Sequence, residues 1–160
     1  MTWSRGKARI EQLLRDGELD TVPASPALAR RLLDEAGRHL ASANAIANTD
    51  PTGCYQLAYD AARKACAALL AQQGLRSTTR GGHIAVQDTV REQFGGSRGM
   101  KAFDALSGMR RRRAASEYPD STTPTITTDD AQDAVIAAQA ILDAARQLLD
   151  SNRLDTFRPD

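Results

Sequence analysis

Four consecutive arginines, Arg110 to Arg113, are the side chains of this sequence with the greatest potential for chemistry. A guanidinium group stays charged at physiological pH and presents a planar fork of donors that suits phosphates and carboxylates. Successive residues point about 100° apart around a helix, so four arginines cannot share one solvent-facing stripe. We therefore expect at least one of them to face a groove, a partner or a phosphate. The alternative is a solvated helix end, where cations complement the helix dipole.

Two further polar side chains, Glu117 and Tyr118, follow the arginines at helical spacing. Arg113 and Glu117 are four residues apart and can form an ion pair that would orient the carboxylate. Arg111 and Tyr118 are separated by two helical turns, so we expect them on one face of the helix. The alternative for Tyr118 is that its ring closes the core above Pro119.

The chain has two histidines, His39 and His83. His83 follows a glycine pair at a predicted helix start. It is either a surface residue or a displaced catalytic or RNA-contacting group, since imidazole exchanges protons near neutral pH. His39 lies within a predicted helix and is interpreted as structural or solvent-facing. Arg76 and Arg80 lie in a polar, basic loop just before His83 and are candidate nucleic-acid contacts.

Apolar residues recur at helical spacing along nearly the whole chain, and the alternation typical of strands is absent. Ser25-Pro26 and Asp50-Pro51 are helix-start pairs, Gly74 is a helix end and Pro119 is a stop. We expect helices over about residues 7–16, 25–48, 51–73, 83–94, 103–118 and 128–149. Long antiparallel helices with short links predict an all-α, up-and-down bundle of five to six helices.

The helix over residues 51–73 should be central, because small residues on its inward stripe let neighbouring helices approach closely. That stripe is Ala58, Ala61, Ala62, Ala65 and Leu69. The inward stripe of the preceding helix is predicted to be Leu28, Leu32, Ala36, Leu40 and Ala43. We expect three parts: an N-terminal helix and linker over residues 1–24, the bundle over 25–154 and a tail over 155–160.

Composition limits the possible functions. The 160 residues fit one domain, and a net charge of +1 means that any nucleic-acid site must be a local patch. Cys54 and Cys66 lie on one predicted helix about 18 Å apart, too far for a disulfide, which fits a reducing cytoplasm. No signal peptide, membrane span, phosphate-binding glycine loop or metal-ligand spacing is recognisable. We therefore expect a cytoplasmic protein with no membrane association, no cofactor and no metal.

Three segments together resemble the HEPN domain family in its actinobacterial form. They are the helix start at residues 55–65, the glycine-bounded loop at 74–83, and the arginine run that ends in Glu117-Tyr118. The resemblance implies a helical bundle over roughly residues 28–149. Many HEPN proteins are metal-independent ribonucleases of toxin–antitoxin and defence systems. Their dimers bring two copies of an arginine–histidine motif to one cleft, often with a tyrosine shortly after the histidine.

Alignment on Tyr118 makes Arg111 the motif arginine and puts Ser116 where the motif has histidine. The resemblance thus implies a catalytic set of Arg111, Ser116, Glu117 and Tyr118. It also implies nucleic-acid contacts from Arg110, Arg112, Arg113, Arg76, Arg80 and His83. Serine cannot shuttle a proton near neutral pH as imidazole does. The expected function is therefore a homodimer that binds RNA, a nucleotide or a partner protein within a toxin–antitoxin or defence system.

Two alternatives remain. One is a metal-independent endoribonuclease toxin with an atypical site of Arg111, Ser116, Glu117 and Tyr118, assisted by His83. The other is a DNA-binding regulator, for which the helix-turn-helix spacing and excess basic charge are missing. Because some HEPN proteins pair with nucleotidyltransferases, the resemblance also implies such a partner, or another toxin–antitoxin protein, and Tyr118 as a modification site.

Overall fold

The computed structural model describes residues 5–96 and 101–159, which form six α-helices, one 3₁₀-helix and one small sheet. The predicted all-α bundle is confirmed. Its helices are α1 (Lys7–Arg15), α2 (Pro26–Ile46), α3 (Pro51–Gln73), α4 (Gly82–Phe94), α5 (Leu106–Glu117) and α6 (Thr128–Asp150), with the 3₁₀-helix η1 (Lys101–Ala105) before α5. The predicted break at 95–99 lies partly outside the described residues.

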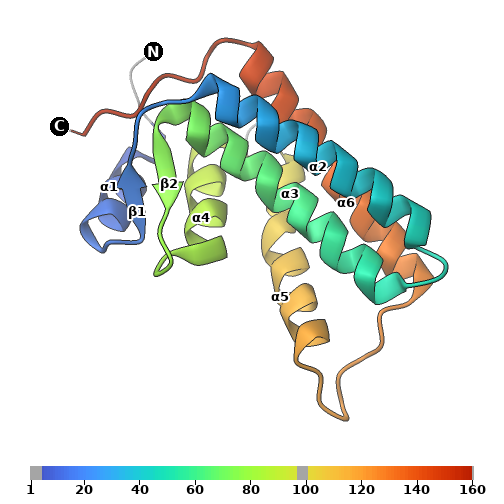
Figure 1. Cartoon of the computed structure of the whole chain (residues 1–160). Coiled ribbons are helices and arrows are strands. Elements are labelled where there is room, and N and C mark those ends of the chain that lie inside the picture. The colour runs from blue at the N-terminus through green and yellow to red at the C-terminus, as the bar shows by residue number, and fades with distance from the viewer. Residues whose placement is uncertain (1–4, 97–100, 160) are drawn as a thin grey trace.

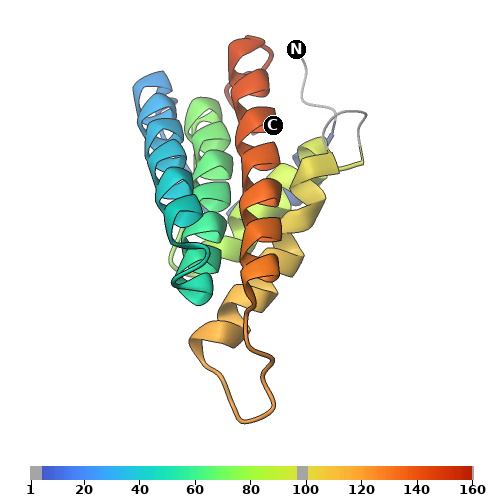
Figure 2. The ribbon, with the colours of Figure 1, turned by 90° about the vertical axis from the view of Figure 1, so that its right-hand side faces the viewer.

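Three long helices, α2, α3 and α6, lie side by side and form the body of the molecule (Figures 1 and 2). The helices α4 and α5 pack against α3. Helix α5 and the loop at 118–127 extend away from this body, and the chain then returns into α6 (Figure 1). Helix α3 is therefore the element that contacts both α4 and α5, and it brings their side chains together.

Helix α3 is central because its inward residues are small. The predicted stripe of alanines with Leu69 is buried. Without long side chains between them, the backbones of neighbouring helices approach closely and bury more apolar surface per turn. The helix ends at Gly74 in a left-handed conformation, as predicted.

Side-chain caps fix the helix starts. Ser25 Oγ accepts a hydrogen bond from the Leu28 amide, and Asp50 Oδ1 accepts one from the Gly53 amide, as the two X-Pro pairs predicted. Helix α6 has a reciprocal capping box in which Thr127 and Asp130 each accept from the other's backbone.

Two expectations from composition can be compared with the structure. Cys54 and Cys66 are both free and buried in α3, and burial strongly raises the pKa of the Cys66 thiol. Within residues 5–96 and 101–159, no helix combines the length and apolar character required to cross a membrane.

The core also includes Ile10 and Leu13 from α1 and Phe157 near the C-terminus, so both end segments pack on the bundle.

The structure also contains one small sheet, which the absence of strand-type alternation did not indicate. β1 (Leu19–Thr21) pairs antiparallel with β2 (Leu75–Ser77), and Asp20 lies opposite Arg76. Three residues are too few to give a recognisable alternation, and the pairing joins segments far apart in the sequence.

The predicted inward stripe of α2 was wrong in its first turn. Leu28 is 36% exposed, whereas Ala29 and Leu33 are buried and continue into Ala36 and Leu40. Adjacent leucines at positions 32 and 33 made two stripes equally plausible from sequence. Packing against α3 selects the one that begins at Ala29.

Gly74→Ala should lower the free energy of unfolding by about 2 kcal/mol or more. Gly74 has φ = 75°, and an added Cβ would lie 2.8 Å from the Val22 carbonyl oxygen. Urea denaturation measures the change.

Gly108→Ala is the matched control. Gly108 lies in α5, and a Cβ there would meet no atom within 4 Å. This variant should be about 0.5–1 kcal/mol more stable than the wild type, because alanine favours helix. Equal effects at the two positions would contradict the account of Gly74.

Candidate functional site

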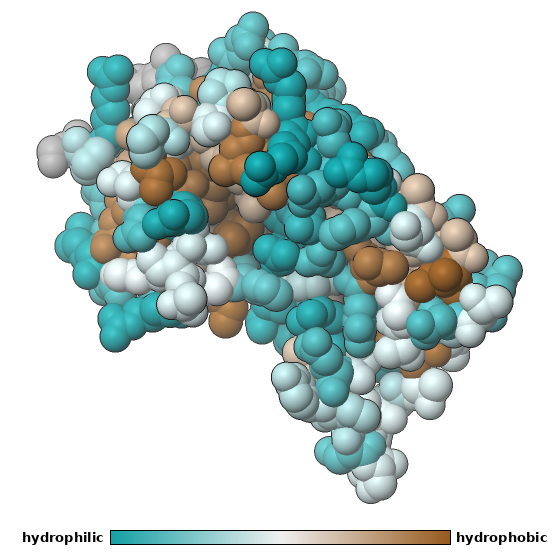
Figure 3. Space-filling view, viewed as in Figure 1, coloured by the Kyte–Doolittle hydropathy of each residue, from teal (hydrophilic) through white to brown (hydrophobic). Residues whose placement is uncertain are grey.

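Three helices bring five polar side chains together. Tyr59 and Arg63 are one turn apart on α3, His83 lies in the first turn of α4, and Arg110 and Arg113 lie on α5. Tyr59 is buried, whereas the other four are half-buried. Hydrophilic side chains cover the surface between α4 and α5 (Figure 3). Helix α3 therefore supplies the buried side of the site, and α4 and α5 flank it.

The Tyr59 hydroxyl lies 3.2 Å from His83 Nδ1, and the two rings are 5.7 Å apart between centroids. Burial raises the pKa of Tyr59, although the positive charges of Arg63, Arg110 and Arg113 oppose it. Burial also lowers the pKa of His83, and the three arginines add to that effect, against a smaller opposing influence of the Asp60 carboxylate. Both side chains are therefore held in their uncharged forms near neutral pH.

The protonation states define the direction of the hydrogen bond. A neutral tyrosine carries a proton that needs an acceptor when buried, and Tyr59 has no other hydrogen-bond partner among the described residues. The hydroxyl of Tyr59 is thus assigned as the donor and His83 Nδ1 as the acceptor. Neutral His83 then carries its own proton on Nε2, which becomes a hydrogen-bond donor.

Arg113 contacts both the Tyr59 ring and the Glu117 carboxylate. Its guanidinium lies 5.7 Å from the centre of the Tyr59 ring, a cation–π arrangement. Both terminal nitrogens of Arg113 also reach the Glu117 carboxylate, at 3.0 and 3.2 Å. The predicted Arg113–Glu117 pair is confirmed, and it is bidentate.

Arg63 is paired with Asp60 at 2.6 Å, and His39 Nδ1 lies 3.1 Å from the other oxygen of the same carboxylate. Burial acts to raise the pKa of Asp60, but the hydrogen bond and charge of Arg63, with Lys64 and His39, lower it overall. Asp60 is therefore a fixed negative charge beside the site. His39 has a structural role, one of the two roles that its position suggested.

We call the guanidinium groups of Arg63, Arg110 and Arg113 the arginine cluster. The buried Nε of each one donates to no atom in the described part of the chain. Arg63 and Arg113 are paired with carboxylates, whereas no ion pair is found for Arg110 in that part of the chain. Because these Nε atoms are buried, an anion such as phosphate would be bound by the terminal guanidinium nitrogens, in the field of three positive charges from two helices.

The remaining arginines of the run lie elsewhere. Arg112 donates to Asp130 at 3.2 Å and to the Thr125 carbonyl at 3.3 Å. It therefore ties α5 to the start of α6. Arg111 is exposed on the opposite side of the helix from Arg113.

The set of Arg111, Ser116, Glu117 and Tyr118 is not joined by any contact within the described residues. Ser116 Oγ donates to the Arg113 carbonyl at 2.7 Å, one turn back in the helix. Tyr118 lies just beyond α5 and is 84% exposed, so it does not close the core.

Arg76 and Arg80 make contacts near β1 and α1. Arg76 pairs with Asp20 at 3.4 Å across the two-stranded sheet, and Arg80 donates to the Asp16 carbonyl at 3.0 Å. Of the predicted nucleic-acid contacts, only Arg110, Arg113 and His83 are gathered around Tyr59.

Sequence reasoning did not select Tyr59, Asp60 and Arg63 as site residues. The available signal was the Tyr59–Arg63 spacing of one helical turn, within a helix that is otherwise alanine-rich. A large polar ring and a charge rarely occupy such a central helix without a partner.

Residues 29–148, well over half of the chain, match the sequence model of the HEPN domain family. The chain belongs to the HEPN family. The match begins in α2 and ends in α6, so the helices that carry this HEPN site all lie inside it. Comparison with curated proteins and with solved structures gave no match for this HEPN protein.

The His83 pKa gives a pH dependence of stability. Because the folded pKa lies below the unfolded value of about 6.5, the unfolded chain takes up a proton first as pH falls. Stability contributed by neutral His83 is therefore present above about pH 6.5 and lost as pH falls from there toward the lower folded pKa. His83→Gln should remove this component, so its destabilisation relative to wild type should shrink between about pH 7.5 and 5.5. Urea denaturation across that range measures it, and a pH-independent difference would contradict the prediction.

Proposed function

We propose that this HEPN protein binds RNA through the arginine cluster, with His83 as an additional donor to the bound phosphate. The single observation that carries the proposal is the convergence of Arg63, Arg110 and Arg113 on one tyrosine–histidine pair. All three positive charges act on both Tyr59 and His83. A phosphate placed among them would meet the guanidinium fork of Arg110, which has no carboxylate partner among the described residues, beside the paired guanidinium groups of Arg63 and Arg113.

The charge of the site suits one backbone phosphate. Asp60 and Glu117 each neutralise one arginine of the cluster, whereas Arg110 stays uncompensated among the described residues. With His83 neutral, the site has an excess of about one positive charge. This local excess supports RNA binding in a chain whose overall charge is only +1.

Binding is favoured over cleavage because of the proton on His83. A general base must accept a proton from the RNA 2′-hydroxyl, but Nε2 of the assigned tautomer already carries one. Ser116, at the motif histidine position, uses its hydroxyl within its own helix. The resting site is thus equipped to hold a phosphate and not to remove a proton.

A metal-independent endoribonuclease is the second candidate, and His83 is the observation in its favour. The sequence motif lacks histidine, yet the fold supplies an imidazole from α4 beside the arginines of α5. If the Tyr59 hydroxyl rotated to accept from Nδ1, the ring proton could pass from Nε2 to Nδ1 by exchange with solvent, and the unprotonated Nε2 could then act as the base. Cleavage would then depend on His83 and Arg110.

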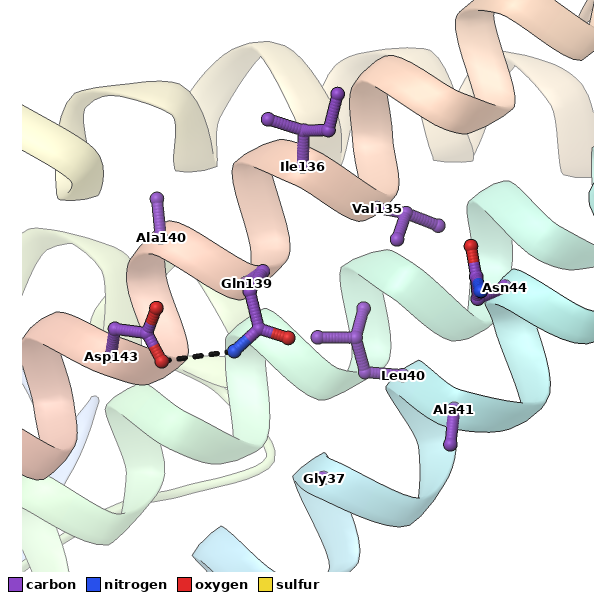
Figure 4. A pocket seen from close by; sticks show the side chains of 9 residues that line it. All are labelled: Gly37, Leu40, Ala41, Asn44, Val135, Ile136, Gln139, Ala140 and Asp143. Atoms are coloured by element: carbon purple, nitrogen blue, oxygen red, sulfur yellow. Dashed lines mark hydrogen bonds between the residues drawn. The ribbon is translucent and has the colours of Figure 1, made fainter.

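We also propose that the protein acts as a homodimer. A groove between α2 and α6 is lined by small residues such as Gly37, Ala41 and Ala140, with Ile136 beside it (Figure 4). Ile136 is 68% exposed. Small residues allow a helix of a second copy to approach, and burial of Ile136 would contribute about 1.5–3 kcal/mol per copy.

The proposed context is a toxin–antitoxin or defence system with a nucleotidyltransferase or another partner. The 84% exposure of Tyr118 makes its hydroxyl accessible to such an enzyme. An unchanged intact mass of the protein after exposure to its cognate transferase and ATP would contradict Tyr118 modification.

Arg110→Ala should weaken binding of a short labelled single-stranded RNA about tenfold, since a charged hydrogen-bond donor is lost. The dependence of log K on log salt should become shallower by about 0.7 for one lost phosphate contact. Fluorescence anisotropy over a salt series measures both quantities.

Arg31→Ala is the matched control, because Arg31 lies on α2 and pairs, among the described residues, with Glu35 of the same helix at 3.9 Å. Equal weakening by the two variants would contradict a site at the arginine cluster. If the same RNA is cleaved in chelator, and His83→Ala abolishes the cleavage, the ribonuclease candidate replaces simple binding.

Ile136→Asp should convert the dimer to monomer in light scattering, with at least a tenfold rise in the dimer dissociation constant. Ile84→Asp is the control, since Ile84 is 48% exposed on α4, away from the α2–α6 groove. A monomeric wild-type protein, or dissociation by both variants alike, would contradict this interface.

A further inference from the structure

Glu117 occupies the position on Arg113 that a phosphate would need. Its two carboxylate oxygens lie 3.0 and 3.2 Å from the two terminal nitrogens of the guanidinium. Carboxylate and phosphate groups use this fork in the same bidentate way, so only one of them can be bound to it at a time. The terminal donors of Arg113 are thus engaged in the free protein.

The two carboxylates of the site differ in how firmly they are held. Asp60 contacts Arg63 and His39, and the charge of Lys64 also stabilises its ionised form. Glu117 has only Arg113 as an ion-pair partner in the described part of the chain, and it is the last residue of α5. An incoming anion would therefore displace Glu117 and leave Asp60 in place.

Displacement is energetically feasible. The Arg113 and Glu117 side chains retain 27% and 35% of their exposure, so water already screens their attraction. Arg113 also has a contact that does not involve Glu117, since its guanidinium carbon lies 5.7 Å from the centre of the Tyr59 ring. The arginine would remain oriented for a new ligand after the carboxylate leaves.

We propose that Glu117 is an internal competitor for the RNA phosphate at Arg113, and that RNA binding replaces this carboxylate on the guanidinium fork. The inference rests on the proposed RNA-binding function of the arginine cluster. Before binding, the three arginines face two carboxylates, and after displacement they face only Asp60. Glu117 therefore lowers the affinity of the free site and restricts it to anions that can compete with a carboxylate held on the same helix.

Glu117→Gln tests the inference, because it keeps the size of the side chain and removes its charge. Binding of a short labelled single-stranded RNA should tighten about two- to five-fold, the range expected from release of an exposed ion pair. Asp104→Asn is the matched control, since it removes an exposed carboxylate from η1, immediately before α5. Its affinity should equal that of the wild type.

A double-mutant cycle with Arg113→Ala separates competition from a general charge effect. In the Arg113→Ala background, Glu117→Gln should give no gain. An equal gain in that background, or from Asp104→Asn, would overturn the inference. Unchanged or weaker binding by Glu117→Gln would also overturn it, and the proposed function would stand if Arg110→Ala still weakens binding. If Arg110→Ala has no effect, the proposed function itself fails and the inference fails with it.

Discussion

The close packing of α3 against its neighbours is the constraint on which the rest of the structure depends. Alanines along its buried face let α2 and α6 approach on one side and α4 and α5 on the other. Where this stripe is interrupted by Tyr59, the ring is surrounded on nearly all sides, and its hydroxyl must find a partner at that depth. His83 supplies it from α4. The site thus arises where a helix built for close approach carries one large polar side chain.

The same packing explains how three arginines can be tolerated together. Each guanidinium is only half-buried, and two of the three have a carboxylate partner from their own helix, at spacings of three and four residues. The aromatic face of Tyr59 supplies a further partner for Arg113. Arg110 lacks such compensation among the described residues. An unpaired, half-buried guanidinium is unfavourable, but contact with water keeps that free-energy cost small. A bound anion would offset it.

Much of the fold could be predicted because local signals agreed with the global arrangement. Ser25, Asp50 and Gly74 fix the ends of helices through their own backbone chemistry, which sequence alone reveals. The pairing of Arg113 with Glu117 was predictable for the same reason, since both lie on one helix. The pairing of β1 with β2 and the contact of His83 with Tyr59 were not. Each joins segments whose proximity is decided by how helices pack, and neither leaves a periodic pattern in the sequence.

The protonation of the Tyr59–His83 pair links this packing to function. Burial disfavours the charged forms of both rings, and the surrounding arginines disfavour a charged imidazole further. A histidine in a more exposed position, away from the arginines, would exchange protons near neutral pH and suit acid–base catalysis. Here the environment favours a neutral donor beside positive charges, which suits the binding of phosphate. In the proposed function, the choice between holding and cleaving RNA would therefore depend on which nitrogen of His83 carries the proton, and so on the partner of Nδ1.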